Sequence, residues 1–496
     1  MRNRFSRRHF LTALLASAAV PAVAQPPKAS LRPTARAADF FKRAVPGFEN
    51  ILAEARLDAS IGFAVVDVRT GTILEEHRAD TGIAPASVTK AVTAVYALET
   101  LGAGHRFQTR LIATGPVQNG VLTGDLVLAG GGDPTLDTDD LGKLAAALKA
   151  AGVREVRGAF RVADGALPRV TSISSEQPDH VGYSPAISGI ALNFNRVHFE
   201  WRRGQNGYGV TMDARTQKYR PEVSMAKMRV IDRRTPIYTY SDERTHDAWT
   251  VARGALGKGG ARWLPVRKPD LYAGDVFRTL ARSNGIVLPQ AKLTERVPAG
   301  TVLSSHQSAP LQDILKDMLR YSTNLTAEMV GLSATQKRVG RVTNLRASAN
   351  EMNKWARGRF GVSGIDVVDH SGLGSKSRMT ASAMAKALQV ANSAGQLRPI
   401  LRKISIKDTR GRPIPDHPLN VAAKTGTLNF VSCLAGFVEA EDGTDLAFAI
   451  FAADEKTRSR IGKANREAPQ GARPWNRRAK QMQQALIERW GTLYGS

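Results

Sequence analysis

Apolar positions in the first part of the chain predict a helix, then two strands joined by a short turn, and then a second helix. Phe40–Leu57 has apolar side chains at helical spacing, and Ile61–Val68 then has the composition of a buried strand. A short turn leads into a second strand over Thr72–Glu76, so we expect a β-hairpin. From Ser87 to Leu101, apolar residues recur every three or four positions, which predicts a helix that begins at Ser87.

The C-terminal part of the chain also contains segments with helical spacing and segments of strand character. Leu311–Tyr321 reads as a helix and Leu325–Leu332 continues with helical spacing, so the residues between them lie at a junction of two helices. Extended segments follow, beginning at Lys424, at Leu434–Phe437 and at Leu446–Phe451. These strands and the N-terminal hairpin can join one antiparallel sheet, and Gln481–Leu493 would be the closing helix. The pattern predicts an α/β (α+β) fold in which helices flank an antiparallel sheet.

Between these two parts, residues 105–303 are rich in short strands punctuated by Gly, Pro and Asn, so we expect β-rich inserted domains there. The most distinctive string of this region is Gly124–Leu136, which is rich in glycine. A phosphate-binding loop is one interpretation, but the string lacks the Lys-Ser/Thr of a P-loop. We favour a tight backbone turn, for which glycine is also suited.

The first residues, Met1–Ala24, have the composition of an export signal, because arginines precede a weakly apolar run that closes in Ala22-Val23-Ala24. This run is too short to span a bilayer as a helix. Ser6–Leu11 resembles a twin-arginine signal, which a translocase for folded proteins reads, and an Arg-rich signal of the general secretory route is the alternative. Both interpretations predict export, and we expect the protein in the periplasm.

The chain of 496 residues carries a formal net charge of +26. A basic excess can indicate nucleic-acid binding, but an exported chain without a nucleic-acid motif fits an anionic envelope surface or an acidic wall polymer better. The densest basic stretch is Lys456–Lys480, for which a solvated loop before the last helix is the alternative. The single cysteine, Cys433, excludes an internal disulfide, and the nine histidines form no metal-binding motif, so we expect no metal and no cofactor.

Three short strings carry the candidate chemistry. They are Ser87-Val88-Thr89-Lys90, Ser322-Thr323-Asn324 and Lys424-Thr425-Gly426-Thr427. A serine hydroxyl needs a neighbouring base to attack a carbonyl, and Lys90 lies one helical turn from Ser87, so we expect a nucleophile and a general base. A free lysine titrates at about 10.4, so burial and a second cation, Lys424, would have to lower the pKa of Lys90.

The other residues of these strings fit the same reaction. Ser322 can pass protons between the two lysines, and Asn324 can hold both Lys90 and the backbone of a substrate. The backbone N–H groups of Ser87 and Thr427 can form an oxyanion hole. A glycine in the strand would let a substrate peptide lie along its edge, and hydroxyl groups there suit a substrate that ends in a carboxylate. The strand residues that would make these substrate contacts are Thr425, Gly426 and Thr427.

Together the three strings resemble the active site of the class C low-molecular-mass penicillin-binding proteins, the D-alanyl-D-alanine carboxypeptidase/endopeptidases of bacterial cell-wall metabolism. Further matching strings are Gly124–Leu136, Tyr183-Ser184-Pro185, Asn193-Phe194-Asn195 and Asp369–Leu373. The resemblance implies that Ser87 is acylated by peptidoglycan stem peptides that end in D-Ala-D-Ala, by D-alanyl to diaminopimelate cross-links, and by β-lactams. Water would then release the acyl group.

The resemblance also implies a division into domains. Residues 25–104 and 304–496 would form a discontinuous penicillin-binding catalytic domain with the serine transpeptidase-like fold. Residues 105–303 would be the inserted region, with a further domain nested over residues 197–270.

The chain departs from the family pattern in the last of the matching strings. The family often reads Asp-Gly-Ser-Gly-Leu-Ser-Arg, where this chain has His370, Gly374 and Ser375. Arg378 is therefore a candidate for the basic residue that meets the diaminopimelate carboxylate. Asp179 is a candidate for the acid that meets the diaminopimelate ammonium group, and an exposed aspartate before a turn is the alternative.

Two other functions fit parts of the sequence. A β-lactamase-like hydrolase would share the Ser/Lys machinery, but class A enzymes add a glutamate base, for which the inserted region offers no clear equivalent. A non-catalytic cell-wall-binding scaffold would have no need for the whole set of reactive side chains. That set is Ser87, Lys90, Ser322, Asn324 and Lys424.

Overall fold

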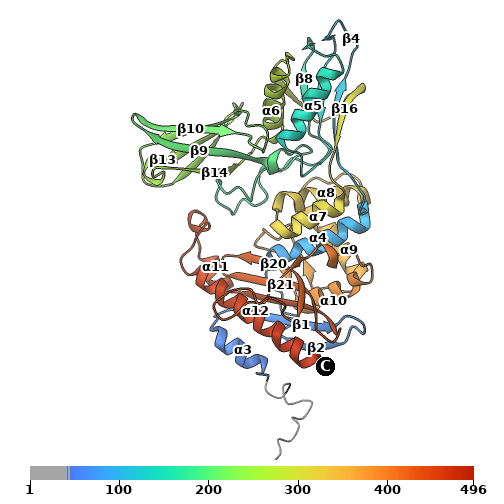
Figure 1. The fold of residues 1–496 in the computed structure, drawn as a ribbon, viewed down its shortest axis with the longest axis vertical. Coiled ribbons are helices and arrows are strands. Elements are labelled where there is room, and N and C mark those ends of the chain that lie inside the picture. The colour runs from blue at the N-terminus through green and yellow to red at the C-terminus, as the bar shows by residue number, and fades with distance from the viewer. Residues whose placement is uncertain (1–41, 43–44, 496) are drawn as a thin grey trace, which may run out of the picture. The chain divides into compact units, whose positions relative to one another are not determined.

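A six-stranded antiparallel sheet organises the part of the chain that carries the three motifs (Figure 1). The computed structural model describes residue 42 and residues 45–495, so the predicted export signal lies outside the described residues. The strand order is β19-β20-β21-β22-β1-β2. The bounds are β1 Ser60–Asp67, β2 Ile73–His77, β19 Arg402–Lys403, β20 Asn420–Leu428, β21 Val431–Glu439 and β22 Asp445–Ala453. The predicted union of the N-terminal hairpin with the late strands is confirmed, because β1 pairs with β22.

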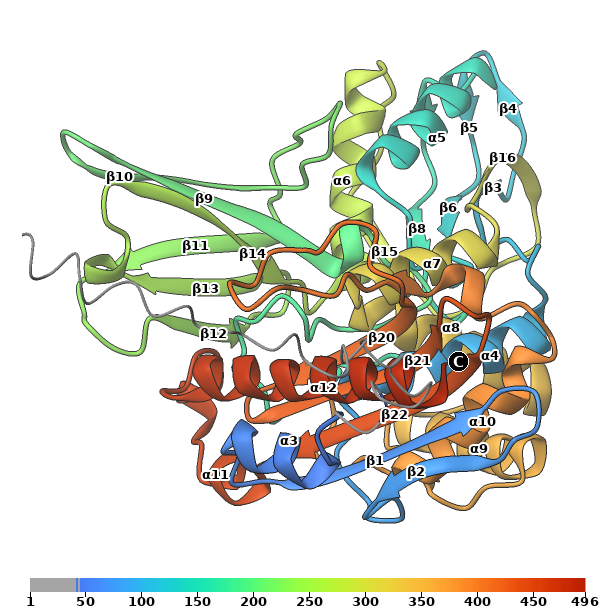
Figure 2. The same cartoon turned by 60° about the horizontal axis from the view of Figure 1, so that its bottom comes forward.

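Helices cover both faces of this sheet (Figure 2). α3 (Phe48–Ala55) and α12 (Ala472–Tyr494) share a buried core with one face, and α10 (Ala381–Asn392) packs against β1 and β22 on the other. The remaining long helices that share a core with α10 are α4 Thr89–Leu101, α7 Leu311–Tyr321, α8 Asn324–Val339 and α9 Leu345–Phe360. Because β21 and β22 are buried on both faces, their sequences read as continuous apolar runs.

The last helix is longer than predicted. It begins at Ala472 rather than at Gln481, because Trp475, Ala479 and Met482 are buried at helical spacing among the basic residues of this stretch. A solvated loop was one of the two interpretations of those basic residues. Several of them instead lie on the exposed face of the first turns of α12.

Three other predicted elements are present with shifted ends. Within the described residues, α3 occupies only the later part of the helix that was predicted over Phe40–Leu57. Strand β20 begins four residues before Lys424. The helix that was predicted to open at Ser87 begins at Thr89, and Ser87 lies in a 3₁₀ turn that leads into it.

The region between α4 and α7 contains a five-stranded sheet of order β15-β8-β6-β3-β16 and two three-stranded sheets, β10-β9-β14 and β11-β13-β12. The bounds of these strands are β3 Gln108–Ala113, β6 Leu126–Ala129, β8 Phe160–Ala163, β9 Arg196–Gly204, β10 Gly207–Asp213, β11 Ala226–Ile231, β12 Tyr238–Asp242, β13 Asp247–Ala252, β14 Gly259–Pro265, β15 Ala291–Thr294 and β16 Thr301–Gln307. Shorter strands are β4 Val117–Gln118, β5 Val121–Leu122, β7 Glu155–Val156, β17 Ile365–Asp366 and β18 Arg378–Met379. The expected richness in short strands is confirmed.

Two helices of this region were missed from the sequence. They are α5 (Thr138–Ala150) and α6 (Pro269–Ser283). A capping signal marks the start of α5, because the Asp137 side chain accepts the N–H of Asp140 and the reverse contact is also made. From Pro46 onward the described chain clusters as one compact unit, so the division into domains stays a prediction.

No helix in residues 45–495 combines the length and the apolar character that crossing a membrane requires.

Candidate active site

Ser87 and Lys90 lie side by side at the start of α4. Lys90 Nζ lies 3.0 Å from Ser87 Oγ, and the Lys90 side chain is fully buried. The same amine donates to Asn324 Oδ1 at 2.8 Å and to the carbonyl oxygen of Ser371 at 2.7 Å. Three acceptors therefore surround one buried amine, and one of them is the hydroxyl of the predicted nucleophile.

The second motif lies at a junction of two helices, as the sequence predicts. Ser322 ends α7 in the left-handed region with φ 59°, and α8 begins at Asn324. Lys424 Nζ donates to Ser322 Oγ at 3.1 Å and to the carbonyl oxygen of Thr425 at 2.6 Å. Asn324 Nδ2 donates to the carbonyl oxygen of Tyr183 at 2.9 Å, which ties the site to the region between α4 and α7.

The third motif lies in β20, against the turn that holds the serine. One side of β20 pairs with β21 along its whole length, whereas β19 pairs only with Ala422 and Ala423 on the other side. Within residues 45–495, that second edge has no strand partner from Lys424 onward. A Cβ on Gly426 would lie 2.8 Å from the carbonyl oxygen of Pro85. The glycine is thus required for the contact between β20 and the turn, in addition to the predicted role of leaving room for a substrate peptide.

Both lysines have lowered pKa values, and burial is the largest cause for each. Burial lowers the pKa of Lys90 to about 8, against the charges of Glu328 and Asp369, which raise it. Burial lowers the pKa of Lys424 to about 7, with further lowering by the charges of Lys90 and Arg402. The sequence analysis expected the charge of Lys424 to lower the pKa of Lys90. The charge of Lys90 is instead the second cause of the lowered pKa of Lys424, and charging either amine disfavours charging the other.

A buried carboxylate that the sequence analysis missed lies close to Lys90. Glu328 follows Asn324 by one turn of α8 and accepts the backbone N–H groups of His370 and Ser371 at 3.0 and 2.9 Å. Burial is the largest cause that raises the pKa of Glu328, whereas the two backbone N–H donors and the charge of Lys90 lower it and so favour the carboxylate. Glu328 is the only charged residue in the first half of α8, and a charge in an otherwise buried helical run was the signal that could have revealed it.

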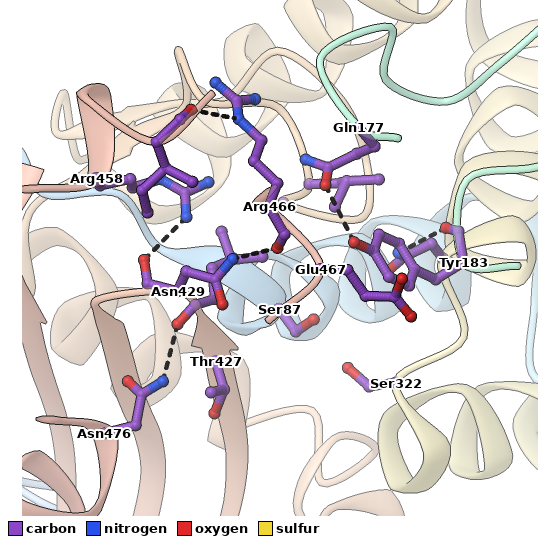
Figure 3. A pocket seen from close by; sticks show the side chains of 15 residues that line it. Ser87, Gln177, Tyr183, Ser322, Thr427, Asn429, Arg458, Arg466, Glu467 and Asn476 are labelled. Carbon is purple, nitrogen blue, oxygen red and sulfur yellow. Dashed lines mark hydrogen bonds between the residues drawn. The ribbon is translucent and has the colours of Figure 1, made fainter. Parts of the chain in front are cut away.

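A pocket of about 330 Å³ lies in front of Ser87 (Figure 3). Its lining includes Ser87, Gln177, Tyr183, Ser322, Asn324, Thr427, Asn429, Arg458, Arg466 and Glu467. Arg458 donates to the carbonyl oxygen of Asn429 at 3.0 Å, and burial lowers its pKa. Part of the basic stretch Lys456–Lys480 therefore lines the pocket. The two interpretations from the sequence were contact with an anionic surface or polymer and a solvated loop.

Residues 46–470 match the D-Ala-D-Ala carboxypeptidase 3 (S13) family. The chain belongs to this family. It is similar to the D-alanyl-D-alanine carboxypeptidase of Actinomadura sp. (strain R39), with 30% identity over 478 residues that cover 85% of each chain. It is also similar to D-alanyl-D-alanine carboxypeptidase DacB of Haemophilus influenzae, with 26% identity over 79% of this chain and 85% of the relative.

Solved structures agree on the fold. The crystal structure of penicillin binding protein 4 (dacB) from Haemophilus influenzae aligns with 89% of this chain and 99% of its own, at a TM-score of 0.72 and 20% identity. A second crystal structure of that protein, in complex with a β-lactam, aligns with 82% of this chain and 93% of its own, at a TM-score of 0.68 and 23% identity. The predicted fold class is confirmed, and the S13 match confirms the predicted family and serine-type peptidase.

Two residues that the resemblance proposed for this S13 family member do not line the pocket in the described chain. The Asp179 side chain is 58% exposed and contacts Lys463 at 2.9 Å. Arg378 contacts Glu455 at 2.8 Å and also donates to the carbonyl oxygen of Ser375. Both candidates are thus engaged by ion pairs with the connection between β22 and α12, and their roles toward substrate stay predictions.

Proposed function

We propose that this chain is a D,D-peptidase of peptidoglycan metabolism that forms an acyl-enzyme on Ser87. It removes the terminal D-Ala from D-Ala-D-Ala stem peptides, cleaves D-Ala to diaminopimelate cross-links, or does both. The observation that carries the proposal is the 3.0 Å contact between Ser87 Oγ and Lys90 Nζ, at a pocket that Ser322 and Thr427 also line. The S13 family match supports the same reaction class.

Lys90 acts as the general base in its neutral form. A neutral amine has two protons and one lone pair, so it can keep both hydrogen bonds to Asn324 Oδ1 and to the Ser371 carbonyl and direct the lone pair at Ser87 Oγ. Ser87 Oγ then forms a bond to the carbonyl carbon of the penultimate D-Ala while its proton passes to Lys90 Nζ. The negative charge on the carbonyl oxygen is stabilised by the backbone N–H groups of Ser87 and Thr427.

Ser322 and Lys424 serve the leaving group. Lys424 Nζ donates to Ser322 Oγ, and this hydroxyl lines the pocket, so a proton can pass through it to the departing amine. The peptide C–N bond breaks and the released D-Ala, or the amine of the cross-link, carries that proton away. Water then attacks the ester carbonyl and gives one proton through Ser322 to Lys424, the bond between the acyl carbon and Ser87 Oγ breaks, and Lys90 returns its proton to Ser87 as the acid is released.

The substrate peptide lies along the unpaired edge of β20. Backbone groups of this edge can hydrogen-bond an extended peptide, and the hydroxyl groups of Thr425 and Thr427 contact its terminal carboxylate beside Lys424. We assign the contact with a side-chain carboxylate of the substrate to Arg458 rather than to Arg378, since Arg458 lines the pocket. Gly426 contributes by keeping this strand close to the Ser87 turn.

β-Lactams acylate the same serine, because they present a carbonyl to the same oxyanion hole. The enzyme acts in the periplasm, and the composition of Met1–Ala24 supports export by a twin-arginine signal. The excess of positive charge supports peripheral contact with an anionic envelope surface.

Labelling with a fluorescent penicillin tests the proposal. We expect a stable label on the wild type and none on Ser87→Ala. Rapid loss of the label would indicate a β-lactamase-like hydrolase, and absence of label on the wild type would indicate a scaffold. Digestion of purified cross-linked muropeptides, followed by mass measurement of the products, separates loss of one D-Ala from cleavage of the cross-link.

A further inference from the structure

Two buried carboxylates hold the loop that contacts Lys90. Glu328 is fully buried, and each of its oxygens accepts one backbone N–H, from His370 and from Ser371. Asp369, at the start of the same loop, accepts two further N–H groups of that loop at 2.7 and 2.6 Å. Four backbone donors of one short loop are therefore paired with two carboxylates, an arrangement that fixes the loop in one conformation.

The position of this loop matters because one of its carbonyl groups contacts the reactive amine. The N–H of Ser371 donates to Glu328, and the carbonyl oxygen of Ser371 accepts from Lys90 Nζ at 2.7 Å. These groups belong to adjacent peptide units, so a rotation that released Glu328 would also move the carbonyl. The loop is also packed against the serine turn, since a Cβ on Gly372 would lie 1.8 Å from the carbonyl oxygen of Ala86.

Charged and titratable groups face Lys90 from each element that packs on it. Helix α8 supplies Glu328, the loop supplies Asp369, and β20 supplies Lys424, while the imidazole of His370 in the same loop contacts Ser348 and Met352. The His370 imidazole stays neutral, because burial lowers its pKa to about 3. The two carboxylates are therefore the groups that favour a charged Lys90, in opposition to burial.

We propose that Glu328 is a positioning residue for the proton transfer between Ser87 and Lys90. It holds the Ser371 carbonyl against Lys90 Nζ, and its negative charge sets the pH range in which Lys90 can take up the Ser87 proton. This role rests on the function proposed above, since it concerns the same acylation step. It differs from the role of Asn324, which contacts the amine directly.

Three variants of the full chain test this role. Glu328→Gln removes the charge and keeps the size of the side chain. Glu328→Asp keeps the charge but withdraws the oxygens from the loop. Thr326→Val is the matched control, because Thr326 is buried on the same helix and its hydroxyl has no hydrogen-bond partner within residues 45–495. Each variant is measured by the rate of acylation by fluorescent penicillin across pH and by NMR titration of Lys90 with isotope-labelled lysine.

We expect Glu328→Gln to lower the midpoint of both titrations by about one pH unit, because loss of a nearby negative charge favours the neutral amine. Glu328→Asp should acylate about tenfold more slowly with the midpoint in place, because the carbonyl contact is misplaced. Thr326→Val should behave as the wild type. A wild-type midpoint in Glu328→Gln overturns the proposal.

If Glu328→Gln does not fold, as judged by thermal unfolding, Glu328→Asp decides the question. A wild-type acylation rate in Glu328→Asp overturns the role in holding the loop, and a slower rate supports it. The NMR titration does not require acylation, so it separates this role from the proposed function. Failure of the proposed function would instead leave the wild type without label.

Discussion

The buried groups beneath the pocket, here called the floor, and the groups on the two outer segments that carry Gln177 and Ile461 of its lining, here called the rim, hold their charges in opposite ways. On the floor, Lys90, Lys424 and Glu328 are at most 1% exposed, and each is hydrogen-bonded to hydroxyl or backbone groups. On the rim, the side chains of Asp179 and Lys463 are 58% and 48% exposed, and they contact each other directly.

This difference indicates that the floor and the rim are suited to different tasks. Burial disfavours the charged form of a group, so a charge that is held mainly by neutral dipoles lies close to the point at which it gains or loses a proton. An exposed ion pair keeps its charges and contributes little to stability. The floor is therefore suited to proton transfer, and the rim is suited to selecting the ligand that enters.

The largest effect is expected on the floor. Lys90→Met removes the proposed general base and keeps an unbranched side chain in the buried site, so acylation by penicillin should fall by about a thousandfold or more. Stopped-flow labelling measures the rate, and thermal unfolding checks that the variant is folded. Near-normal acylation in Lys90→Met would contradict the assignment of the base and would remove the functional contrast between floor and rim.

The pH dependence of acylation in the wild type should also be set on the floor, by the protonation of Lys90. The protonated form of Lys90 cannot accept a proton, and its pKa is about 8, so the active fraction decreases as pH falls through this value. We expect acylation to fall about tenfold for each pH unit well below that pKa. Rates measured at constant ionic strength test this expectation, and a flat profile between neutral and mildly acidic pH would count against it.

A smaller effect is expected at Arg458, the residue of the pocket lining that is proposed to contact substrate. Arg458→Gln should raise KM for a stem peptide with an acidic side chain about tenfold, with kcat nearly unchanged, because one charge-assisted contact is lost. Arg460→Gln is the matched control, since Arg460 lies on the same connection and is exposed. Equal KM values for the two variants would exclude Arg458 from substrate recognition.

The smallest effect is expected for the exposed ion pair. Asp179→Asn should change the free energy of unfolding by less than about 1 kcal/mol and leave KM within about twofold, because the lost partner is a solvated lysine. Chemical denaturation and steady-state kinetics measure the two quantities. A large increase in KM would instead restore Asp179 to the substrate site that the family resemblance suggested.

The motifs and the central sheet were predictable because each depends on local pattern. Residues 322–324 lie between two helical repeats, and the apolar runs of β21 and β22 can only be buried strands of a sheet. Glu328 and Arg458 were not predictable in the same way, since their importance arises from neighbours far away in the chain. A basic residue on a connecting segment looks like a solvated side chain until the fold brings it to the pocket.

The hydrogen bond from Asn324 Nδ2 to the carbonyl oxygen of Tyr183 connects two segments that lie far apart in the sequence. Glu467, in the connection between β22 and α12, makes a further link to the region between α4 and α7, because it contacts both His180 and Arg262. A chimera that exchanged the segment around Tyr183 between related enzymes would therefore also have to exchange the connection that carries Glu467. Shortened versions built from the motif-bearing segments alone would lose one wall of the entrance, so the smallest functional unit is larger than the reacting groups suggest.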